Sequence, residues 1–362
     1  MAVRASCCPA PTPGGRPRSC GPSAGARPRP RRSGRRWTGA PASSSGGCSP
    51  PPAADPAPAR CCRVGRGQEE SPRVNAVPSG LVVVDKPPGM TSHDVVARLR
   101  RILGTRKIGH AGTLDPMATG VLVCGVGRGT KLLGHLALDT KAYTATVRLG
   151  ATTSTDDAEG EVIATADATA VDDAAIAAGM AALTGAIEQV PSSVSAIKVD
   201  GKRAYARVRA GEEVVLPARP VTVSQFRLLA RRGDDLDVLV ECSSGTYVRA
   251  LARDLGSGLG VGGHLTALRR TRVGPFPLEH ARTLEELEQG SALTLSLDEA
   301  VGVAFPRRDL DAALAGDITH GRPLPAAGVS GTYGVFAPDG RALALVSERG
   351  ELARPVVVLA PA

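Results

Sequence analysis

The hydrophobic pattern that predicts regular structure begins near residue 80. The continuous apolar run Leu81-Val-Val-Val84 predicts a buried strand, and the Lys86-Pro-Pro-Gly89 sequence after it predicts a turn. A helix is expected next, because apolar residues recur at helical spacing between a capping Thr91 or Ser92 and the stop at Gly104. The chain therefore enters its folded part through a strand, a turn and a helix.

The remaining pattern predicts further strands and helices in alternation. The expected elements are a polar loop bounded by glycines over 109–120, strands over 121–126 and 143–149, a short helix over 130–138, an acidic loop over 152–161, a helix over 172–183, a hairpin of 221–229 with 236–242, and a helix ending at 255. Strands that arrive in pairs, with helices between some of them, predict an α+β domain whose mixed sheet is largely antiparallel and flanked by helices.

Three segments are expected along the chain. Residues 1–78 lack apolar periodicity, residues 79–299 carry the predicted α+β domain, and residues 300–362 contain short apolar runs separated by turns with glycine. The last segment is therefore predicted to be a small β-rich domain.

The positive charge of the chain lies in the first segment. Residues 1–78 carry 13 Arg, no Lys and three acids, a formal charge of +10, whereas the whole chain has +9 and the remainder therefore −1. A segment of Pro, Gly, Ser and Arg cannot offset the entropy of ordering by burying apolar surface, so disorder is expected. An organellar transit peptide, or a true translation start near Val74 or Val77, remains open. The basic isoelectric point is thus no evidence for RNA binding.

Cysteine usage and hydropathy limit the class of protein. Only Cys124 and Cys242 lie beyond the first segment, no cysteines show C-x-x-C spacing, and no run approaches the roughly 18 apolar residues of a membrane span. No metal site is visible, and a soluble protein of the reducing cytoplasm is expected. The adjacent pair Asp156-Asp157 is not read as metal ligands, because neighbouring residues point apart on a strand.

The most distinctive segment is the loop Gly109-His-Ala-Gly-Thr-Leu-Asp-Pro-Met-Ala-Thr-Gly120. Its glycines allow tight turns that present the Asp115 carboxylate at the entrance of a strand. In isolation an Asp-Pro turn is most often structural. This loop, however, resembles the catalytic motif of the TruB family of pseudouridine synthases. Further segments in the same order resemble the rest of that family, namely Leu81 to Ser92, Lys141-Ala-Tyr143, Gln189 to Tyr205, Cys242-Ser-Ser-Gly-Thr-Tyr-Val-Arg249 and Leu268 to Gly274.

The resemblance implies a pseudouridine synthase fold with a PUA-like C-terminal domain. It also implies an isomerase that converts uridine 55 in the T-loop of tRNA to pseudouridine, by flipping the base, cleaving its glycosidic bond and rejoining it through C5. The expected partner is tRNA, bound at the T-arm and elbow by a monomer without an obligate protein partner or a membrane. The reaction changes neither redox state nor composition, so no metal or cofactor is expected.

The family motifs also imply roles for individual residues. Asp115 would be the catalytic carboxylate, Arg249 the cation that keeps it ionised and orients it, and Tyr143 the ring that stacks on uracil and handles the C5 proton. The residues expected to bind the substrate are His110, which would fill the gap left by the flipped base, with Lys86, Tyr247 and Leu268. The residues expected to contact the RNA backbone are Lys198, Lys202, Arg203, Arg269 and Arg270.

Two other functions remain open. The chain could be the catalytic subunit of a guide-RNA-dependent pseudouridine synthase, or a tRNA-folding chaperone on the same fold without catalysis. The presence of Asp115, Tyr143 and Arg249 disfavours an inactive scaffold. Activity of the isolated chain on a T-arm transcript would separate the three.

Overall fold

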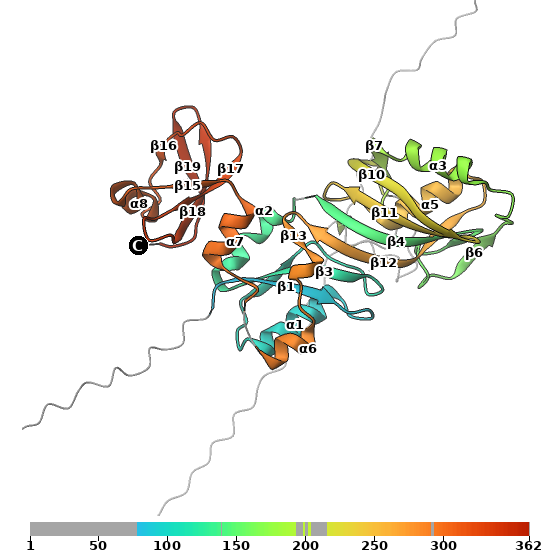
Figure 1. The fold of residues 1–362 in the computed structure, drawn as a ribbon, viewed down its shortest axis with the longest axis horizontal. Coiled ribbons are helices and arrows are strands. Elements are labelled where there is room, and N and C mark those ends of the chain that lie inside the picture. The colour runs from blue at the N-terminus through green and yellow to red at the C-terminus, as the bar shows by residue number, and fades with distance from the viewer. Residues whose placement is uncertain are drawn as a thin grey trace, which may run out of the picture. The chain divides into compact units, whose positions relative to one another are not determined.

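The computed structural model describes residues 78–138, 140–192, 198–199, 202–203, 216–290 and 293–361. Over these ranges a ten-stranded mixed sheet forms the body of the protein (Figure 1). Its main path is β14 (Leu295–Ser296), β1 (Gly80–Lys86), β3 (Thr119–Val126), β12 (Gly263–Val273), β4 (Lys141–Leu149), β11 (Asp235–Cys242), β10 (Arg219–Arg232) and β7 (Gly185–Gln189). Off this path, β2 (Ile108–Ala111) pairs with β3 and β13 (Phe276–Pro277) pairs with β12.

The sheet consists of two antiparallel halves joined by a short parallel contact. β12 pairs with β3 only at Arg269 opposite Thr119 and Arg270 opposite Gly120. The strand pairs described on either side of this contact, such as β1 with β3 and β4 with β12, are antiparallel. We call this contact the seam. The predicted α+β class with a mixed, largely antiparallel sheet is therefore confirmed.

The first half, built on β1 and β3, is buried on both faces. The helices α1 (Ser92–Ile102) and α6 (Leu284–Gln289) pack on one face, where Val82, Val84, Leu99 and Leu122 form a common core. Thr91 caps α1 in a capping box with Asp94, as the sequence predicted for its start. The opposite face is covered by the short elements η1 (Gly127–Lys131), α2 (Leu133–Leu136) and α7 (Leu297–Ala304).

The second half, built on β4, β10, β11 and β12, has its helices on one face. Figure 1 shows α3 (Asp173–Ala182) and α5 (Val248–Gly258) together on that face, and both contribute to the largest core cluster. β4 shows the predicted alternation, with Tyr143, Ala145 and Val147 buried on the core side. The predicted hairpin is present as β10 and β11. Burial of this one face positions the ends of β4 and β12 and the start of α5 around a common space.

Smaller elements complete the description. They are β5 (Ala151–Thr153) paired with β6 (Val162–Thr165), β8 (Lys198–Val199) paired with β9 (Lys202–Arg203), and η2 (Leu278–His280). A five-stranded sheet follows near the C-terminus, formed by β15 (Arg307–Asp309), β17 (Thr332–Phe336), β18 (Ala342–Arg349), β19 (Leu352–Val358) and β16 (Leu324–Pro325), with the helix α8 (Ala312–Thr319). In the described ranges no helix combines the length and apolar character that a membrane crossing requires.

Candidate active site

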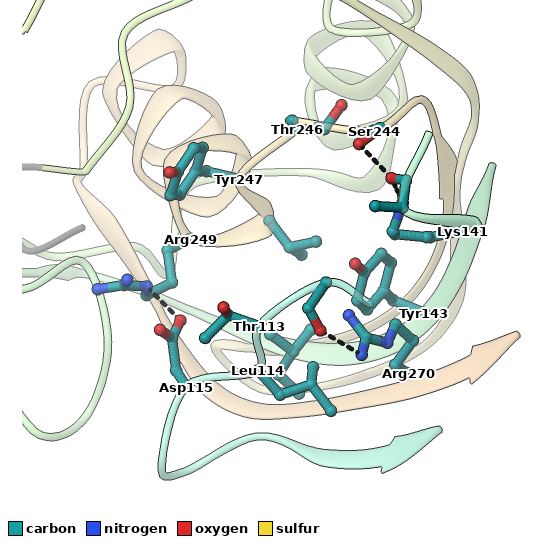
Figure 2. A pocket seen from close by; sticks show the side chains of 15 residues that line it. Thr113, Leu114, Asp115, Lys141, Tyr143, Ser244, Thr246, Tyr247, Arg249 and Arg270 are labelled. Atoms are coloured by element: carbon teal, nitrogen blue, oxygen red, sulfur yellow. Dashed lines mark hydrogen bonds and ion pairs between the residues drawn. The ribbon is translucent and has the colours of Figure 1, made fainter. Parts of the chain in front are cut away.

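A cavity of about 290 Å³ opens where the two halves of the sheet meet. Its walls come from segments far apart in the sequence, as Figure 2 shows: the loop between β2 and β3, the strands β4 and β12, and the segment that leads into α5. The lining residues are Gly112, Thr113, Leu114, Asp115, Ala137, Lys141, Tyr143, Ser244, Gly245, Thr246, Tyr247, Val248, Arg249, Leu268 and Arg270. The cavity therefore collects the residues of several sequence motifs in one place.

The loop of residues 112–118, called here the Asp115 loop, is held at both of its sides. Leu114 N donates to Ser92 Oγ at 2.9 Å, and Ser92 Oγ donates to Leu114 O at 3.1 Å. On the other side of the carboxylate, Pro116 O accepts from Gly89 N at 2.9 Å and from Lys86 Nζ at 3.1 Å. Asp115 is thus fixed between two anchored neighbours, which fits a group that must be presented at one orientation.

Asp115 forms an ion pair with Arg249, which in turn binds a second carboxylate. Arg249 Nε lies 3.1 Å from Asp115 Oδ2, and Arg249 Nη1 lies 3.2 Å from Asp157 Oδ2. The same Nη1 donates to Thr155 O at 2.9 Å. The side chains of Arg249 and Asp157 are buried, whereas that of Asp115 is 39% exposed and faces the pocket. Asp157 therefore fixes the back of the guanidinium and leaves its Nε for Asp115.

The pKa of Asp115 is raised above the usual value for an aspartate. Burial is the largest cause, because protein atoms surround the carboxylate although part of its side chain is open to the pocket, and the charge of Asp157 acts in the same direction. Arg249 and then Lys86 oppose these effects. Arg249 was expected to keep the carboxylate ionised. Its contribution has that sign, but it does not outweigh burial.

Lys86 is fully buried and binds the backbone of the Asp115 loop. Its ammonium donates to the carbonyls of Pro87 at 2.9 Å, Met90 at 2.6 Å and Pro116 at 3.1 Å. Burial lowers the pKa of Lys86 to about 8, although the charge of Asp115 acts against this shift. With three carbonyls around its ammonium, Lys86 joins the turn after β1 to the Asp115 loop.

Two side chains on neighbouring strands face the cavity with apolar surface. Tyr143 on β4 and Leu268 on β12 are 6% and 8% exposed, and both line the pocket. A planar base of about their own width could lie between an aromatic ring and an aliphatic side chain. Burial, as the largest cause, raises the pKa of the Tyr143 hydroxyl, while Arg270 acts in the opposite direction.

Tyr247 stands at the N-cap of α5, two residues before Arg249. Its backbone is clamped by the amide of buried Gln189, since Tyr247 N donates to Gln189 Oε1 at 2.8 Å and Gln189 Nε2 donates to Tyr247 O at 3.1 Å. This clamp fixes the segment that presents both Tyr247 and Arg249 to the pocket.

His110 lies on β2, outside the set of residues that line the cavity. Its ring meets His93 edge to face, with centroids 5.4 Å apart and planes at 85°. Burial, helped by the charges of His93 and Arg270, lowers the pKa of His110 to about 4. The ring is therefore neutral near pH 7, which suits stacking on bases better than a hydrated cation would.

The predicted RNA-contacting residues fall into three groups. Lys198, Lys202 and Arg203 have their backbones in β8 and β9, but their side chains lie outside the described residues. Arg269 is partly exposed and pairs with Asp85 at 2.7 Å. Arg270 was expected on a surface that contacts RNA phosphates. Its 1% exposure corrects that expectation, because the side chain is enclosed in the wall of the pocket.

Sequence reasoning missed Asp157 and the support from Gln189 and Ser92. The acidic pair 156–157 was set aside because adjacent residues point apart, and they do: Asp156 binds Arg253 at 3.1 Å, whereas Asp157 binds Arg249. These two arginines are one helical turn apart on α5. The contacts of Asp156 and Asp157 could have been indicated by the sequence, because two adjacent acids can pair with two arginines that are four residues apart on one helix.

Comparisons with known proteins agree with this arrangement. Residues 100–248 match the model of the TruB family pseudouridylate synthase N-terminal domain, residues 249–311 that of the tRNA pseudouridylate synthase B C-terminal domain, and residues 305–360 that of the tRNA pseudouridine synthase II C-terminal domain. The chain is 64% identical over 300 residues to tRNA pseudouridine synthase B of Nocardia farcinica, covering 82% of this chain and 98% of the relative. It is 62% identical over 298 residues to the protein of that name from Rhodococcus jostii, covering 81% and 98%.

Solved structures show the same fold at greater distance. A chain from the crystal structure of a Cbf5-Nop10-Gar1 complex superposes with a TM-score of 0.62 and 28% identity, over 78% of this chain and 85% of that one. The curated relatives match in sequence along nearly their whole length. On this evidence the chain belongs to the TruB family of pseudouridylate synthases.

Proposed function

We propose that this chain isomerises uridine 55 in the T-loop of tRNA to pseudouridine, with Asp115 as the catalytic carboxylate. The observation that carries the proposal is the Asp115–Arg249 ion pair at the edge of a cavity lined by Tyr143 and Leu268. A carboxylate, a fixed cation and a slot for a planar ring are the groups that this isomerisation requires. The high identity to relatives named tRNA pseudouridine synthase B supports tRNA as the substrate.

The size of the cavity fits a single extruded nucleotide rather than a helical segment. Its volume of about 290 Å³ admits a base and its ribose, while a base stacked inside a folded T-loop would remain outside. The target uridine therefore rotates out of the RNA stack and enters between Tyr143 and Leu268. His110 fills the gap left in the stack, and Arg269 contacts the RNA backbone together with Lys198, Lys202 and Arg203.

Chemistry in the pocket begins at the glycosidic bond. Asp115 acts in its ionised form, and attack on C1′, addition to the ring and a route through a glycal each need that charge. The N1–C1′ bond breaks, the uracil turns within the pocket, and C5 bonds to C1′. Tyr143 then handles the C5 proton. Because Arg249 is held by Asp157 from behind, the ion pair keeps its geometry while the base turns.

The proposed setting is a cytoplasmic monomer that acts on tRNA without metal, cofactor or obligate protein partner. This distinguishes it from a guide-RNA-dependent synthase, which would need the other components of its particle. The 64% identity to the Nocardia protein, against 28% to the Cbf5 chain, favours the stand-alone enzyme.

The test is pseudouridine formation by the purified chain alone on a T-arm transcript, without guide RNA. Wild-type protein should convert the target uridine, and Asp115→Asn should abolish conversion while tRNA affinity stays within about tenfold, because the substitution removes a charge but little contact area. Asp235→Asn is the matched control, since Asp235 pairs with the exposed Arg148 at the end of β4, outside the residues that line the pocket, and should keep full activity.

An inactive wild-type chain that becomes active with guide RNA and partner proteins would favour the guide-dependent function. Wild-type binding and refolding of tRNA without any conversion would favour the chaperone. Substantial turnover by Asp115→Asn would remove Asp115 from the reaction.

A further inference from the structure

Arg270 is a buried cation without a carboxylate partner among the described residues. It is 1% exposed, and the ion pairs found along the described ranges, such as those of its neighbours Arg269 and Arg272, do not include it. An isolated charge in the protein interior is costly unless nearby groups compensate it. The groups that surround the Arg270 side chain indicate what its buried charge could do.

The Arg270 guanidinium lies between the Asp115 loop and Tyr143. Its Nε donates to Val121 O at 2.7 Å and its Nη2 donates to Gly112 O at 3.0 Å, at the start of the loop. Arg270 also stands directly opposite Tyr143 in the pairing of β12 with β4, and both side chains line the pocket. Figure 2 shows both of them at one wall of the pocket, opposite the Asp115–Arg249 pair.

The buried charge of Arg270 favours negative charge on groups close to it. Carbonyl oxygens accept its hydrogen bonds but carry no net charge, so the positive charge is only partly compensated at rest. The Tyr143 hydroxyl, which lies beside Arg270 on the pocket wall, can become an anion. Burial opposes ionisation of this hydroxyl, and Arg270 favours it. A fixed guanidinium near an oxygen where charge develops is an established way to stabilise such a state.

We propose that Arg270 is a positioning residue that holds the Tyr143 hydroxyl and stabilises its phenolate while Tyr143 carries the C5 proton. This inference rests on the proposed function, and it adds the group that makes a buried tyrosine competent as a base. Arg270 acts through Tyr143, whereas Arg249 acts on Asp115 at the opposite wall.

The proton step balances without any added reagent. When the N1–C1′ bond breaks, its electron pair stays on the uracil, and the Tyr143 hydroxyl gives its proton to this anion at N1 as the C5–C1′ bond forms. The phenolate then takes the proton from C5. The C5–H electron pair restores the C5–C6 double bond, and the electrons of the N1–C6 double bond return to the nitrogen. Over the cycle one proton moves from C5 to N1, and Tyr143 ends as it began.

The experiment is a double-mutant cycle measured in single turnovers on a T-arm transcript. Four proteins are compared: wild type, Arg270→Gln, Tyr143→Phe and the double variant. The substrate carries either hydrogen or deuterium at C5 of the target uridine. Arg270→Gln should lower the rate roughly a hundredfold, the lower end of what general acid–base catalysis contributes, and should give a normal deuterium isotope effect because C5 deprotonation becomes limiting. Arg270→Lys, which keeps the charge, should recover part of the rate.

Coupling between the two residues decides the outcome. If Arg270 acts through Tyr143, Arg270→Gln should reduce the rate of the Tyr143→Phe protein by less than about threefold. A full additional loss in that background, or a loss in wild type without an isotope effect, would overturn the proposal and leave Arg270 a purely structural residue. If Arg270→Gln does not fold, the same cycle is run with Arg270→Lys.

Controls separate this inference from the proposed function. Arg148→Gln, an exposed arginine on the same strand as Tyr143, should keep the wild-type rate and isotope effect. A wild-type protein that makes no pseudouridine would contradict the proposed function. Active wild type with additive variants would contradict only the role of Arg270.

Discussion

Arg249 pairs with two carboxylates, Asp115 at the edge of the pocket and Asp157 behind it, so the two share one positive charge. Asp115 and Asp157 lie on its two sides, and the like charge of Asp157 contributes to the raised pKa of Asp115. A carboxylate that shares its cation is less stabilised in the ionised form than one in an exclusive ion pair. Removal of the shared cation should therefore act on Asp115 more strongly than removal of an ordinary surface partner.

Replacing Arg249 by alanine should raise the pKa of Asp115 further, because the main opposing charge is lost. Asp115 acts when ionised, so the rate falls as the pH drops through its pKa. The acid limb of the single-turnover pH profile should therefore move to higher pH, and the rate at neutral pH should fall far more than tRNA affinity. Both are measured with saturating T-arm transcript between pH 5 and pH 9, a window of about four pH units around neutrality.

Arg232→Ala serves as control, since Arg232 is exposed and pairs with Asp237 away from the pocket. Its profile should match that of wild type. Equal losses of rate and affinity in Arg249→Ala, with an unmoved acid limb, would show instead that Arg249 is an RNA contact.

The individual site residues that belong to a recognisable sequence motif could be predicted. Asp115, Tyr143 and Arg249 come from segments far apart in sequence and do line one cavity. Asp157 was not part of any motif that indicated a role in the site. Its side chain reaches Arg249 because Asp156 adopts a positive φ of 61° in a turn, and this conformation directs the two acids to different arginines. A local backbone conformation of this kind is not visible in the hydropathy pattern.

Among the elements, strands with a continuous apolar run or a clear alternation were predicted, whereas strands with buried polar residues were not. β1, β4, β10 and β11 match their expected ranges closely. β12 was not predicted as a strand, because bulges at two places break its period and its core-facing positions include His264 and Arg270. β2 was placed in the loop over 109–120, since its four residues include a glycine and a histidine. Tertiary pairing, rather than local pattern, forms both strands.

The close approach of β3 and β12 at the seam requires a glycine at position 120. This residue has a φ of 96°, and an added Cβ would lie 2.2 Å from Arg270 O, a backbone atom that cannot move aside cheaply. Gly120→Ala should therefore lower the free energy of unfolding by more than the roughly 1–3 kcal/mol of backbone strain alone. Urea unfolding of the purified variant measures this directly.

Gly134→Ala is the matched comparison. Gly134 lies in α2 and has open space around the added methyl group, so this change should be neutral or stabilise by about 0.5–1 kcal/mol. Equal stability of the two variants would mean that the strands at the seam can separate without loss.

At the scale of the whole molecule, charge and function are expected to lie in different segments. Residues 1–78 carry a formal charge of +10, while the remainder carries −1. The residues that line the cavity all lie beyond position 110. Phosphate contacts therefore depend on local arginines and lysines of a nearly neutral body, and not on its net charge.

Deleting residues 1–78 should leave kcat/KM on a T-arm substrate within about tenfold of the full-length value at physiological salt. The reason is that the proposed catalytic and substrate-binding groups remain. The measurement is a salt series on both proteins. A much larger loss that lower salt restores would show that the basic segment is an RNA-binding arm, because binding by many arginines steepens the dependence on salt.

The seam also sets when the protein can become active. Asp115 belongs to the half of the sheet that is synthesised first, whereas Tyr143 and Arg249 belong to the second half. β12 completes that second half and pairs with β3, and the two strands are about 150 residues apart in sequence, as in the Arg270–Val121 hydrogen bond. Closing so long a loop is entropically costly and comes late in folding. Until then, the nascent chain has the carboxylate but neither its cation nor a wall of the pocket. The docking of the two halves therefore brings the carboxylate, its cation and the walls of the pocket together.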